Sequence, residues 1–390
     1  MISKATLQLL GNFFRTLTLF AVTPFHWDRA ELQLHVRTAK SRKDLVSRFF
    51  YWINNIVLAL KNIYLLYFLY FHLIPEDNVA GIVLQMILMM TYFCASFHNT
   101  LFWMWPTTVP NLFNECSVFN NETHRTMNPS SKTAYPAEND EIGPILKNCF
   151  GIICILSLSV GLLSVGNPRL APFFGGSLPL KWTEWGPSRV LMSLLEMYLM
   201  GYAWACNLQA FFLIISQAFL FTYWTGELKY VEKAGENFKL PQFSMTYRKL
   251  LILSDLYNIS YSTHVTGLLT FAFPNQVSVN YGTLCLYSSL PFGSWLGCLY
   301  LSLSGAFNLS QLQVLLASPF EVSQTVFESW DKIPGGNRKE ISSMKRFRKY
   351  YRKRYPLRVK RGNFGIFRKE SSIEWLDSLI DKTVSLILIK

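Results

Sequence analysis

Four ionisable side chains stand out inside long apolar stretches of the sequence. They are Lys61, Glu196, Asp255 and His264. Ionisable residues at membrane depth are energetically expensive, so they usually face the interior of a helix bundle or a water-filled cavity and mark ligand or ion pathways. Lys61 also has a structural interpretation, because a lysine can pair with a carboxylate or extend its ammonium group to the membrane interface.

Two groups of polar and aromatic residues are candidates for binding a small molecule. Glu196 lies near the outer end of the fourth apolar stretch with Tyr198 and Tyr202, whereas Tyr261 and His264 lie in the outer half of the fifth. Aromatic rings supply apolar contact area, and a few polar groups fix the orientation of a ligand. We expect these five residues to line an outward-facing cavity. A packed interior with internally bonded tyrosines is the alternative.

An acidic stripe with helical periodicity occupies the end of the chain. At about 100° per residue one face collects six residues: Glu370, Glu374, Asp377, Asp381, Ser385 and Leu388. On a membrane-spanning helix such a stripe requires water or cations. Repeated around a symmetric oligomer, it would form rings of carboxylates that draw cations into a pore. Alternatively, Glu374 and Asp377 lie below the membrane and pair with the basic segment that precedes them.

Signatures of enzymes and of metal sites are missing from the sequence. The motifs GxSxG, GxGxxG and the Walker loop do not occur, and neither does CxxC or HExxH. Each of these spacings places nucleophiles, phosphate-binding amides or metal ligands where the chemistry needs them. The sequence therefore predicts a protein that is not an enzyme, with no catalytic residue, no metal site and no cofactor.

Composition and apolar runs predict the elements that hold these residues. The chain has 390 residues, of which 51% are hydrophobic and 16% charged, a balance typical of membrane proteins. A span needs about 20 apolar residues to cross about 30 Å of hydrocarbon. Stretches of this length lie at 49–73, 79–104, 146–166, 189–224, 248–274 and 279–317, with a more polar one at 371–390. We expect an all-α, polytopic membrane protein with seven transmembrane helices.

The distribution of Lys and Arg predicts the orientation in the membrane. Eight of these residues lie in 1–48, and three, five and fifteen lie in 105–147, 225–250 and 319–369, which is 31 of the 37 in the chain. Short cytoplasmic loops hold such an excess. The N-terminus is therefore expected in the cytoplasm and the C-terminus outside. We attribute the net charge of +13 to orientation and to anionic lipid headgroups rather than to nucleic acid.

Four regions follow from this pattern. They are a cytoplasmic N-terminal segment (1–48), a six-helix bundle with the ligand pocket (49–318), a basic cytoplasmic anchor region (319–369) and a seventh, pore-lining helix (370–390). Within the anchor region Lys339 to Tyr355 reads as a basic helix that Pro356 stops. A small hairpin is expected to follow, because apolar and basic residues alternate around Gly362. An unstructured basic loop is the alternative.

The end of the chain resembles the arthropod gustatory and odorant receptor superfamily. The resemblance rests on the basic, tyrosine-rich run from Arg348 to Phe364, on the short final span and on the terminal stretch TVSLILIK from Thr383 to Lys390. In the family's terminal signature a Thr-Tyr pair precedes five mostly apolar residues, a Gln and a terminal Phe. Thr383 matches this pattern, whereas Val384 replaces the Tyr, Lys390 replaces the Gln and no Phe follows.

The resemblance implies a ligand-gated, non-selective cation channel of the plasma membrane that responds to a small tastant or odorant. It also implies a homo- or hetero-tetramer, with the last helix of each subunit lining a central pore and the cytoplasmic parts forming an anchor between subunits. Carried over by the motif, Ile387 would be the hydrophobic gate and Thr383 would face the conduction path. The acidic stripe instead turns Asp381, Ser385 and Leu388 towards the pore, and both hypotheses stand.

Two other classes of membrane protein are alternatives. A G-protein-coupled receptor also has seven spans, but it requires an outside N-terminus, an acidic-Arg-aromatic triplet after the third span and an Asn-Pro-x-x-Tyr run in the seventh. None of these is where it should be. A secondary transporter is consistent with the buried charges, but that class commonly shows an internal repeat, which we do not find.

Overall fold

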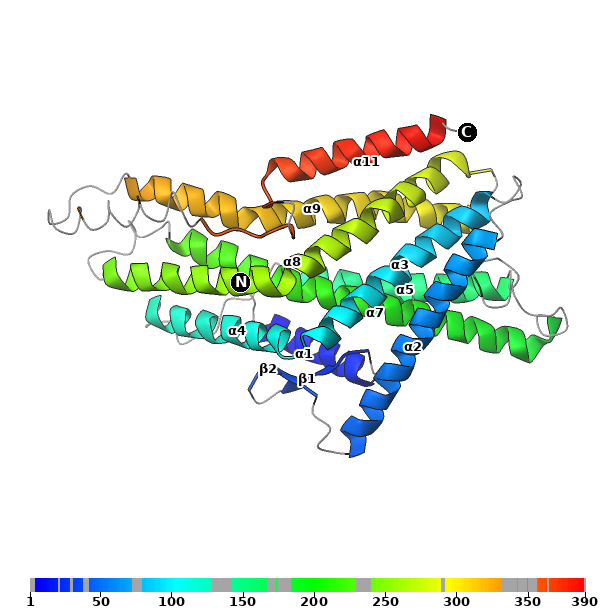
Figure 1. The fold of residues 1–390 in the computed structure, drawn as a ribbon, viewed down its shortest axis with the longest axis horizontal. Helices are drawn as coiled ribbons and strands as arrows, with labels where there is room; N and C mark the ends of the chain where they lie inside the picture. Colours follow the sequence, from blue (N-terminus) through cyan, green and yellow to red (C-terminus); the bar gives the residue numbers. More distant parts are fainter. Residues whose placement is uncertain are drawn as a thin grey trace.

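The computed structural model describes residues 4–19, 22–28, 31–37, 42–71, 79–127, 142–166, 173, 184–228, 240–288, 292–331, 342, 349, 356–362 and 365–388. These residues form long helices and one two-stranded hairpin (Figure 1). The elements in chain order are α1 (Lys4–Leu19), β1 (Phe25–Asp28), β2 (Gln33–Val36), α2 (Arg42–Phe71), α3 (Val79–Met104), α4 (Thr108–Met127), α5 (Ile142–Gly166), α7 (Gly186–Glu227), α8 (Leu240–Cys285), α9 (Phe292–Asp331) and α11 (Glu370–Leu388).

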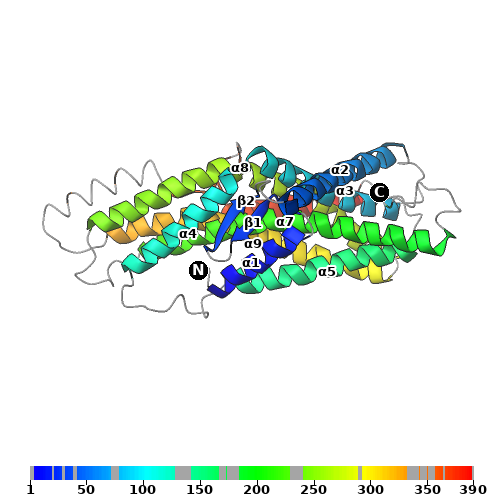
Figure 2. The same ribbon diagram turned by 90° about the horizontal axis from the view of Figure 1, so that it is seen from below.

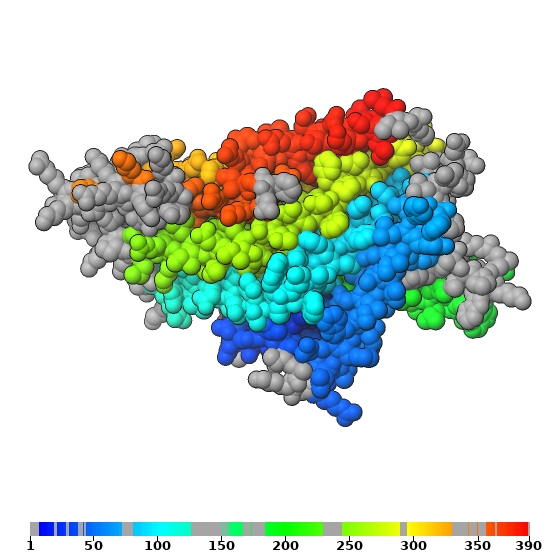
Figure 3. All heavy atoms as spheres, in the orientation of Figure 1, coloured from blue at the N-terminus to red at the C-terminus, as the bar shows by residue number. Residues whose placement is uncertain are grey.

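Helix α7 forms the centre of the bundle and contacts α3, α4, α5, α8 and α9. Its residues 212–218 are buried on every side. A helix that is buried all round is the core element of a larger bundle. In Figure 1 α2 and α3 cross α7 diagonally, and α11 lies at one edge of the molecule, where it contacts α8 and α9. The space-filling view shows α11 in red along this edge (Figure 3).

Small residues let the central helices approach closely. A Cβ at Gly161 would lie 3.1 Å from the Met197 side chain, and the Ser193 hydroxyl donates to the Gly161 carbonyl at 2.5 Å, which joins α5 to α7. On the other side of the bundle Gly267 of α8 leaves room for the Phe97 ring of α3, which a Cβ would overlap. Small residues at crossing points give the backbone contact on which helix packing in a membrane depends.

The outer surface of the bundle is apolar. On α2 the side chains of Phe49, Leu60, Ile63 and Tyr70 are all more than half exposed. Soluble proteins rarely expose such a stripe, because it would associate or aggregate in water. Among the described residues three helices are long and apolar enough to cross a membrane, namely Asp44–Phe71, Gly81–Met104 and Gly186–Glu227. The chain is a membrane protein, and its seven-span count and orientation stay predictions.

The predicted boundary between the fifth and sixth spans is wrong. The sequence placed these spans at 248–274 and 279–317, but α8 continues through Pro274 to Cys285 and α9 begins at Phe292. Proline occurs within membrane helices more often than within soluble ones. Beyond Pro274 the Ser278 hydroxyl donates to the Pro274 carbonyl at 2.9 Å, and the Gln276 amide donates to the Ser302 carbonyl of α9 at 2.8 Å, which joins this part of α8 to α9.

The expected N-terminal segment (1–48) and the expected connection at 105–147 both contain regular secondary structure. The connection expected at 105–147 starts as α4, and the β1–β2 hairpin lies between α4 and α1 (Figure 2). Phe25, Trp27 and Leu34 of the hairpin are buried. The Asn114 side chain of α4 accepts from the Leu34 amide at 2.9 Å and donates to its carbonyl at 2.8 Å. Asn114 therefore pairs with β2 as one residue of a third strand would.

The connector that leads into α11 packs on α8. Its Lys360 and Ile366 form an antiparallel bridge, which lies where the sequence predicts a hairpin. The side chains of Leu357, Val359 and Phe367 are buried. The basic helix predicted for Lys339 to Tyr355 lies outside the described residues, apart from helical positions at 342 and 349.

Candidate functional site

A buried ion pair joins α2 to α7. Lys61 Nζ lies 2.6 Å from Glu196 Oε1, and the two side chains are 0% and 1% exposed. The same ammonium group lies 5.4 Å from the centroid of the Tyr64 ring, so a cation–π contact adds to the pair. Two charges removed from water are tolerated only when each satisfies the other. Glu196 therefore holds α7 against α2. It is the carboxylate partner that the structural interpretation of Lys61 required.

A polar network lies beside this pair. The Asn99 amide donates to Asn55 Oδ1 at 2.8 Å, to the Tyr202 hydroxyl at 3.2 Å and to Cys206 Sγ at 3.2 Å. The Tyr198 hydroxyl donates to Asn54 Oδ1 at 3.0 Å. Tyr202 is buried, whereas 38% of Tyr198 is exposed. The Tyr198 and Tyr202 rings lie 6.4 Å apart, so this ring contact leads from the buried network to the surface of the bundle.

A histidine pair joins α3 to α8. The Nδ1 atoms of His98 and His264 are 3.0 Å apart, and the rings are stacked with centroids 5.2 Å apart. One ring must donate and the other accept, so both cannot carry a proton on Nδ1. The Phe102 ring covers His264 at 4.8 Å, and Tyr261 accepts a hydrogen bond from the Gln217 amide at 3.2 Å.

The five residues predicted to bind a ligand fall into two groups in the structure. The outer group contains Glu196, Tyr198 and Tyr202 on α7, and the inner group contains Tyr261 and His264 on α8. Gln217, which contacts Tyr261, follows Glu196 by 21 residues along α7, a rise of about 30 Å. A small molecule cannot contact both ends of such a distance. The structure thus separates Glu196 from Tyr261. Tyr202 and His264 are linked through adjacent residues of α3, because Asn99 donates to the Tyr202 hydroxyl at 3.2 Å and His98 stacks on His264.

Buried polar atoms without a partner among the described residues mark places where a ligand could bond. They include the Tyr92 hydroxyl of α3 and the Nε2 atoms of His98 and His264. Tyr92 lies beside the ion pair in the fold, because its carbonyl accepts from the amide of Asn62, the residue after Lys61, at 3.4 Å. Buried polar groups are normally paired, so each exception calls for an explanation. Sequence reasoning missed Tyr92, His98 and Asn99, although His98 and Asn99 interrupt the apolar run 79–104 and could have been noticed.

Helix α11 packs on its own subunit through one face. The buried residues are Ser372, Trp375, Leu379 and Thr383, and the Asn280 amide of α8 donates to the Thr383 hydroxyl at 3.4 Å. The opposite face carries the predicted stripe, in which Glu370, Glu374, Asp377, Asp381 and Leu388 are exposed and Ser385 is half-buried. Ile387 is half-buried at the border between the two faces. Asp381, Ser385 and Leu388 thus share the outer face, and Thr383 points into the bundle.

Two further charged residues do not belong to these clusters. Asp255 is exposed on α8, so it is not buried as Lys61, Glu196 and His264 are. Arg37, which follows β2, is buried, and burial lowers the pKa of its guanidinium while the nearby Asp44 carboxylate partly offsets this effect.

Solved structures of an insect receptor have the same fold. No protein-family model and no curated protein matches the sequence. The olfactory receptor OR5 from Machilis hrabei in complex with eugenol superimposes with a TM-score of 0.67 at 10% sequence identity, covering 99% of this chain and 98% of the receptor. A second structure of this receptor gives a TM-score of 0.58 at 11% identity, covering 98% of each chain. The resemblance inferred from the end of the sequence therefore holds for the whole chain at the level of structure, and the chain has the fold of the insect olfactory receptors.

Proposed function

We propose that the chain is a subunit of a ligand-gated, non-selective cation channel of the plasma membrane that responds to a small odorant or tastant. The observation that carries the proposal is the outer face of α11, where Glu374, Asp377 and Asp381 are exposed away from the face that packs on α8 and α9. Carboxylates on a spanning helix are expensive in lipid. They are favourable where identical helices from several subunits surround a cation pathway.

The fold supports this proposal, because the Machilis hrabei receptor with the same fold binds the small aromatic molecule eugenol. In the proposed assembly a homo- or hetero-tetramer surrounds one central pore, and permeating cations pass along the four copies of α11. The cytoplasmic region 319–369 joins the subunits. No enzymatic activity is part of the proposal.

The ligand is proposed to bind at the outer group, next to Glu196 and Tyr202. Tyr198 of this group is partly exposed at the surface, and the Tyr92 hydroxyl provides a hydrogen-bonding group without a partner among the described residues. Binding opens the pore only if the open state binds the ligand more tightly than the closed state does. This difference in affinity limits how far the equilibrium between closed and open states can move. The inner group, Tyr261 and His264, is the alternative location.

Reconstitution tests the channel proposal directly. Purified protein in a planar lipid bilayer should give unitary cation currents without added G protein, and small volatile aromatics such as eugenol should raise the open fraction. The reversal potential under a KCl gradient should follow the cation. A protein that binds such molecules but never passes unitary current would contradict the channel and favour a receptor that acts through a partner.

The proposed topology predicts the accessibility of the two chain ends. An epitope tag before Met1 should be reached by antibody only after the cell is permeabilised, because the proposed topology places 31 of the 37 cationic residues in the cytoplasm with the N-terminus. A tag after Lys390 should be stained on intact cells. Staining of the N-terminal tag on intact cells would contradict the orientation.

The two locations for the ligand predict different mutational effects. Tyr92→Phe should shift the dose-response curve by about two- to tenfold, because a hydrogen bond contributes about 0.5–1.5 kcal/mol. His264→Gln should leave the curve unchanged. Tyr257→Phe is the matched control, because the Tyr257 hydroxyl donates to the Ile214 carbonyl at 3.3 Å and is already satisfied. If His264→Gln shifts the curve and Tyr92→Phe does not, the ligand binds at the inner group.

A further inference from the structure

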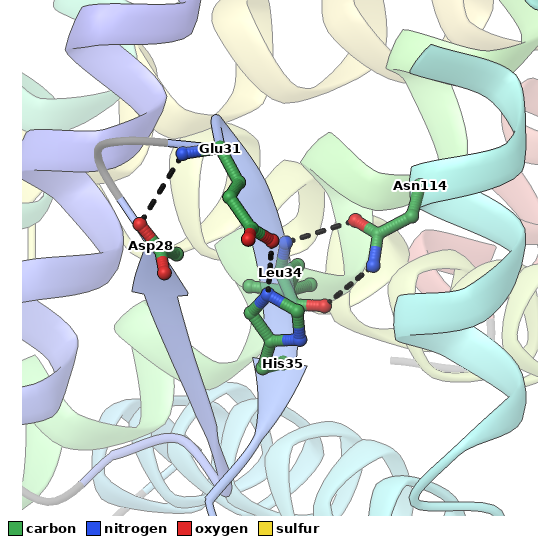
Figure 4. A network of polar contacts seen from close by, with 5 residues as sticks. All are labelled: Asp28, Glu31, Leu34, His35 and Asn114. Atoms are coloured by element: carbon green, nitrogen blue, oxygen red, sulfur yellow. Dashed lines mark hydrogen bonds and ion pairs between the residues drawn. The ribbon is translucent and has the colours of Figure 1, made fainter. Parts of the chain in front are cut away.

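The β1–β2 hairpin presents metal-binding side chains on its outer face. Cross-strand pairing places His26 opposite His35 and Asp28 opposite Gln33. Successive residues of a strand point to opposite faces, so these four side chains share the face opposite to that of Phe25, Trp27 and Leu34. Glu31 belongs to the turn between the strands and lies next to the same face (Figure 4).

Three of these side chains converge. Glu31 Oε2 lies 3.6 Å from His35 Nε2, and one ligand atom each from Asp28, Glu31 and His35 fits within a mutual distance of 4.8 Å. The His26 ring lies beside His35, with ring centroids 5.7 Å apart. Ligands around a tetrahedral zinc ion lie about 2.0–2.2 Å from the metal. These three side chains are exposed or half-buried, so we expect side-chain rotation to bring the three atoms to that distance.

The scaffold beneath the cluster is fixed. The buried face of the hairpin packs on the bundle, Asn114 holds the backbone of Leu34 through two hydrogen bonds, and the Arg37 amide donates to the Pro24 carbonyl at 2.9 Å. Strands held in this way keep His26 and His35 in register. A site on rigid elements binds with less loss of conformational entropy than a site on a free loop.

The donor set decides which cation fits. Imidazole nitrogen with carboxylate oxygen suits zinc and the neighbouring first-row divalent metals, whereas Mg²⁺ and Ca²⁺ prefer oxygen donors alone. Two carboxylates also neutralise the charge of a divalent cation. We propose that Asp28, Glu31 and His35 bind a zinc-class divalent cation at the tip of the hairpin, with His26 adjacent to the fourth position.

This inference differs from the sequence-based expectation of no metal site. That expectation rested on the missing short motifs CxxC and HExxH, which place ligands together within a loop or a helix. The hairpin instead brings its ligands together across two strands and a turn. The site does not depend on the proposed channel function.

Cobalt titration of the purified full-length protein tests the proposal. Co²⁺ should produce the intense visible bands of a low-coordinate nitrogen and oxygen site, saturate at one equivalent per chain and be displaced by Zn²⁺ but not by a large excess of Mg²⁺. Glu31→Gln and His35→Gln should each weaken binding by at least about tenfold, the lower end of the effect measured for residues that support metal ligands.

His124→Gln is the matched control. His124 lies on α4, ten residues beyond Asn114, which corresponds to about 15 Å along the helix. Its replacement should leave the titration unchanged. The variants should elute from size exclusion as the wild type does, because the replaced side chains are exposed or only half-buried. Equal Co²⁺ affinity in the wild type, Glu31→Gln and His35→Gln would overturn the site, and so would an equal loss in His124→Gln.

Discussion

Leu388→Ser is expected to let cations leak through the channel without ligand. Leu388 is 78% exposed on the outer face of α11, near its C-terminal end. An apolar constriction blocks ions because the narrow passage loses its water, and a hydroxyl at that level restores it. Ile387→Ser should have a much smaller effect, because Ile387 is half-buried between the two faces. The measurement is ligand-free current in a planar bilayer for each variant.

Leu386→Ser is the matched control for this substitution. Leu386 is also exposed but lies two residues before Leu388, which is about 160° away around the helix. If Ile387→Ser leaks and Leu388→Ser does not, α11 turns the motif-derived face towards the pore.

Asp381→Asn should lower cation conductance by about tenfold at low salt, the lower end of the range for charged clefts that concentrate counter-ions. High salt should reduce this difference in conductance between Asp381→Asn and the wild type.

Breaking the Lys61–Glu196 pair is expected to destabilise the fold severely. Glu196→Gln or Lys61→Met leaves one charge buried without its partner, and removing one member of such a pair costs about 3–5 kcal/mol. Unfolding of the detergent-solubilised protein should therefore shift to a much lower temperature in either variant. The double variant Lys61→Met with Glu196→Leu should recover most of the loss, because well-packed apolar residues can replace a buried ion pair.

An exposed pair on the same chain provides the control. Lys249 Nζ lies 3.0 Å from Glu122 Oε2, but the two side chains are 50% and 56% exposed. Lys249→Met should cost less than about 1 kcal/mol. A comparable loss in both Lys61→Met and Lys249→Met would mean that burial does not determine the strength of these pairs. A double variant no more stable than the single ones would show that packing around the pair cannot accept apolar side chains.

The helices could be predicted from the sequence because lipid demands long apolar runs. The expected stretch 79–104 has the same bounds as α3, and the expected stretch 146–166 ends at the same residue as α5. The acidic stripe of α11 could also be predicted, since helical periodicity alone places those carboxylates opposite the buried Trp375 and Leu379. Periodicity is a local property, so it needs no knowledge of the tertiary structure.

Pairings between distant elements could not be predicted in the same way. Lys61 and Glu196 are 135 residues apart, and each alone was compatible with several partners. The expected stretches 248–274 and 279–317 left a break within α8, whereas the bond from Gln276 to the Ser302 carbonyl depends on the position of α9. The two histidines of the hairpin were not considered as ligands, because only the strand register brings them together.

The connector before α11 is attached to α8 at two points, which has a mechanical consequence. Asn258 accepts from the Lys360 amide at 2.7 Å and donates to the Arg358 carbonyl at 2.8 Å. Gly362, at φ +53°, leaves no room for a Cβ against the Thr266 hydroxyl. These points on α8 are eight residues apart, or about 12 Å. A single contact would let the connector rotate about one point of α8. Two contacts also fix the direction of the connector, so we expect a tilt of α8 to move the base of α11 with it.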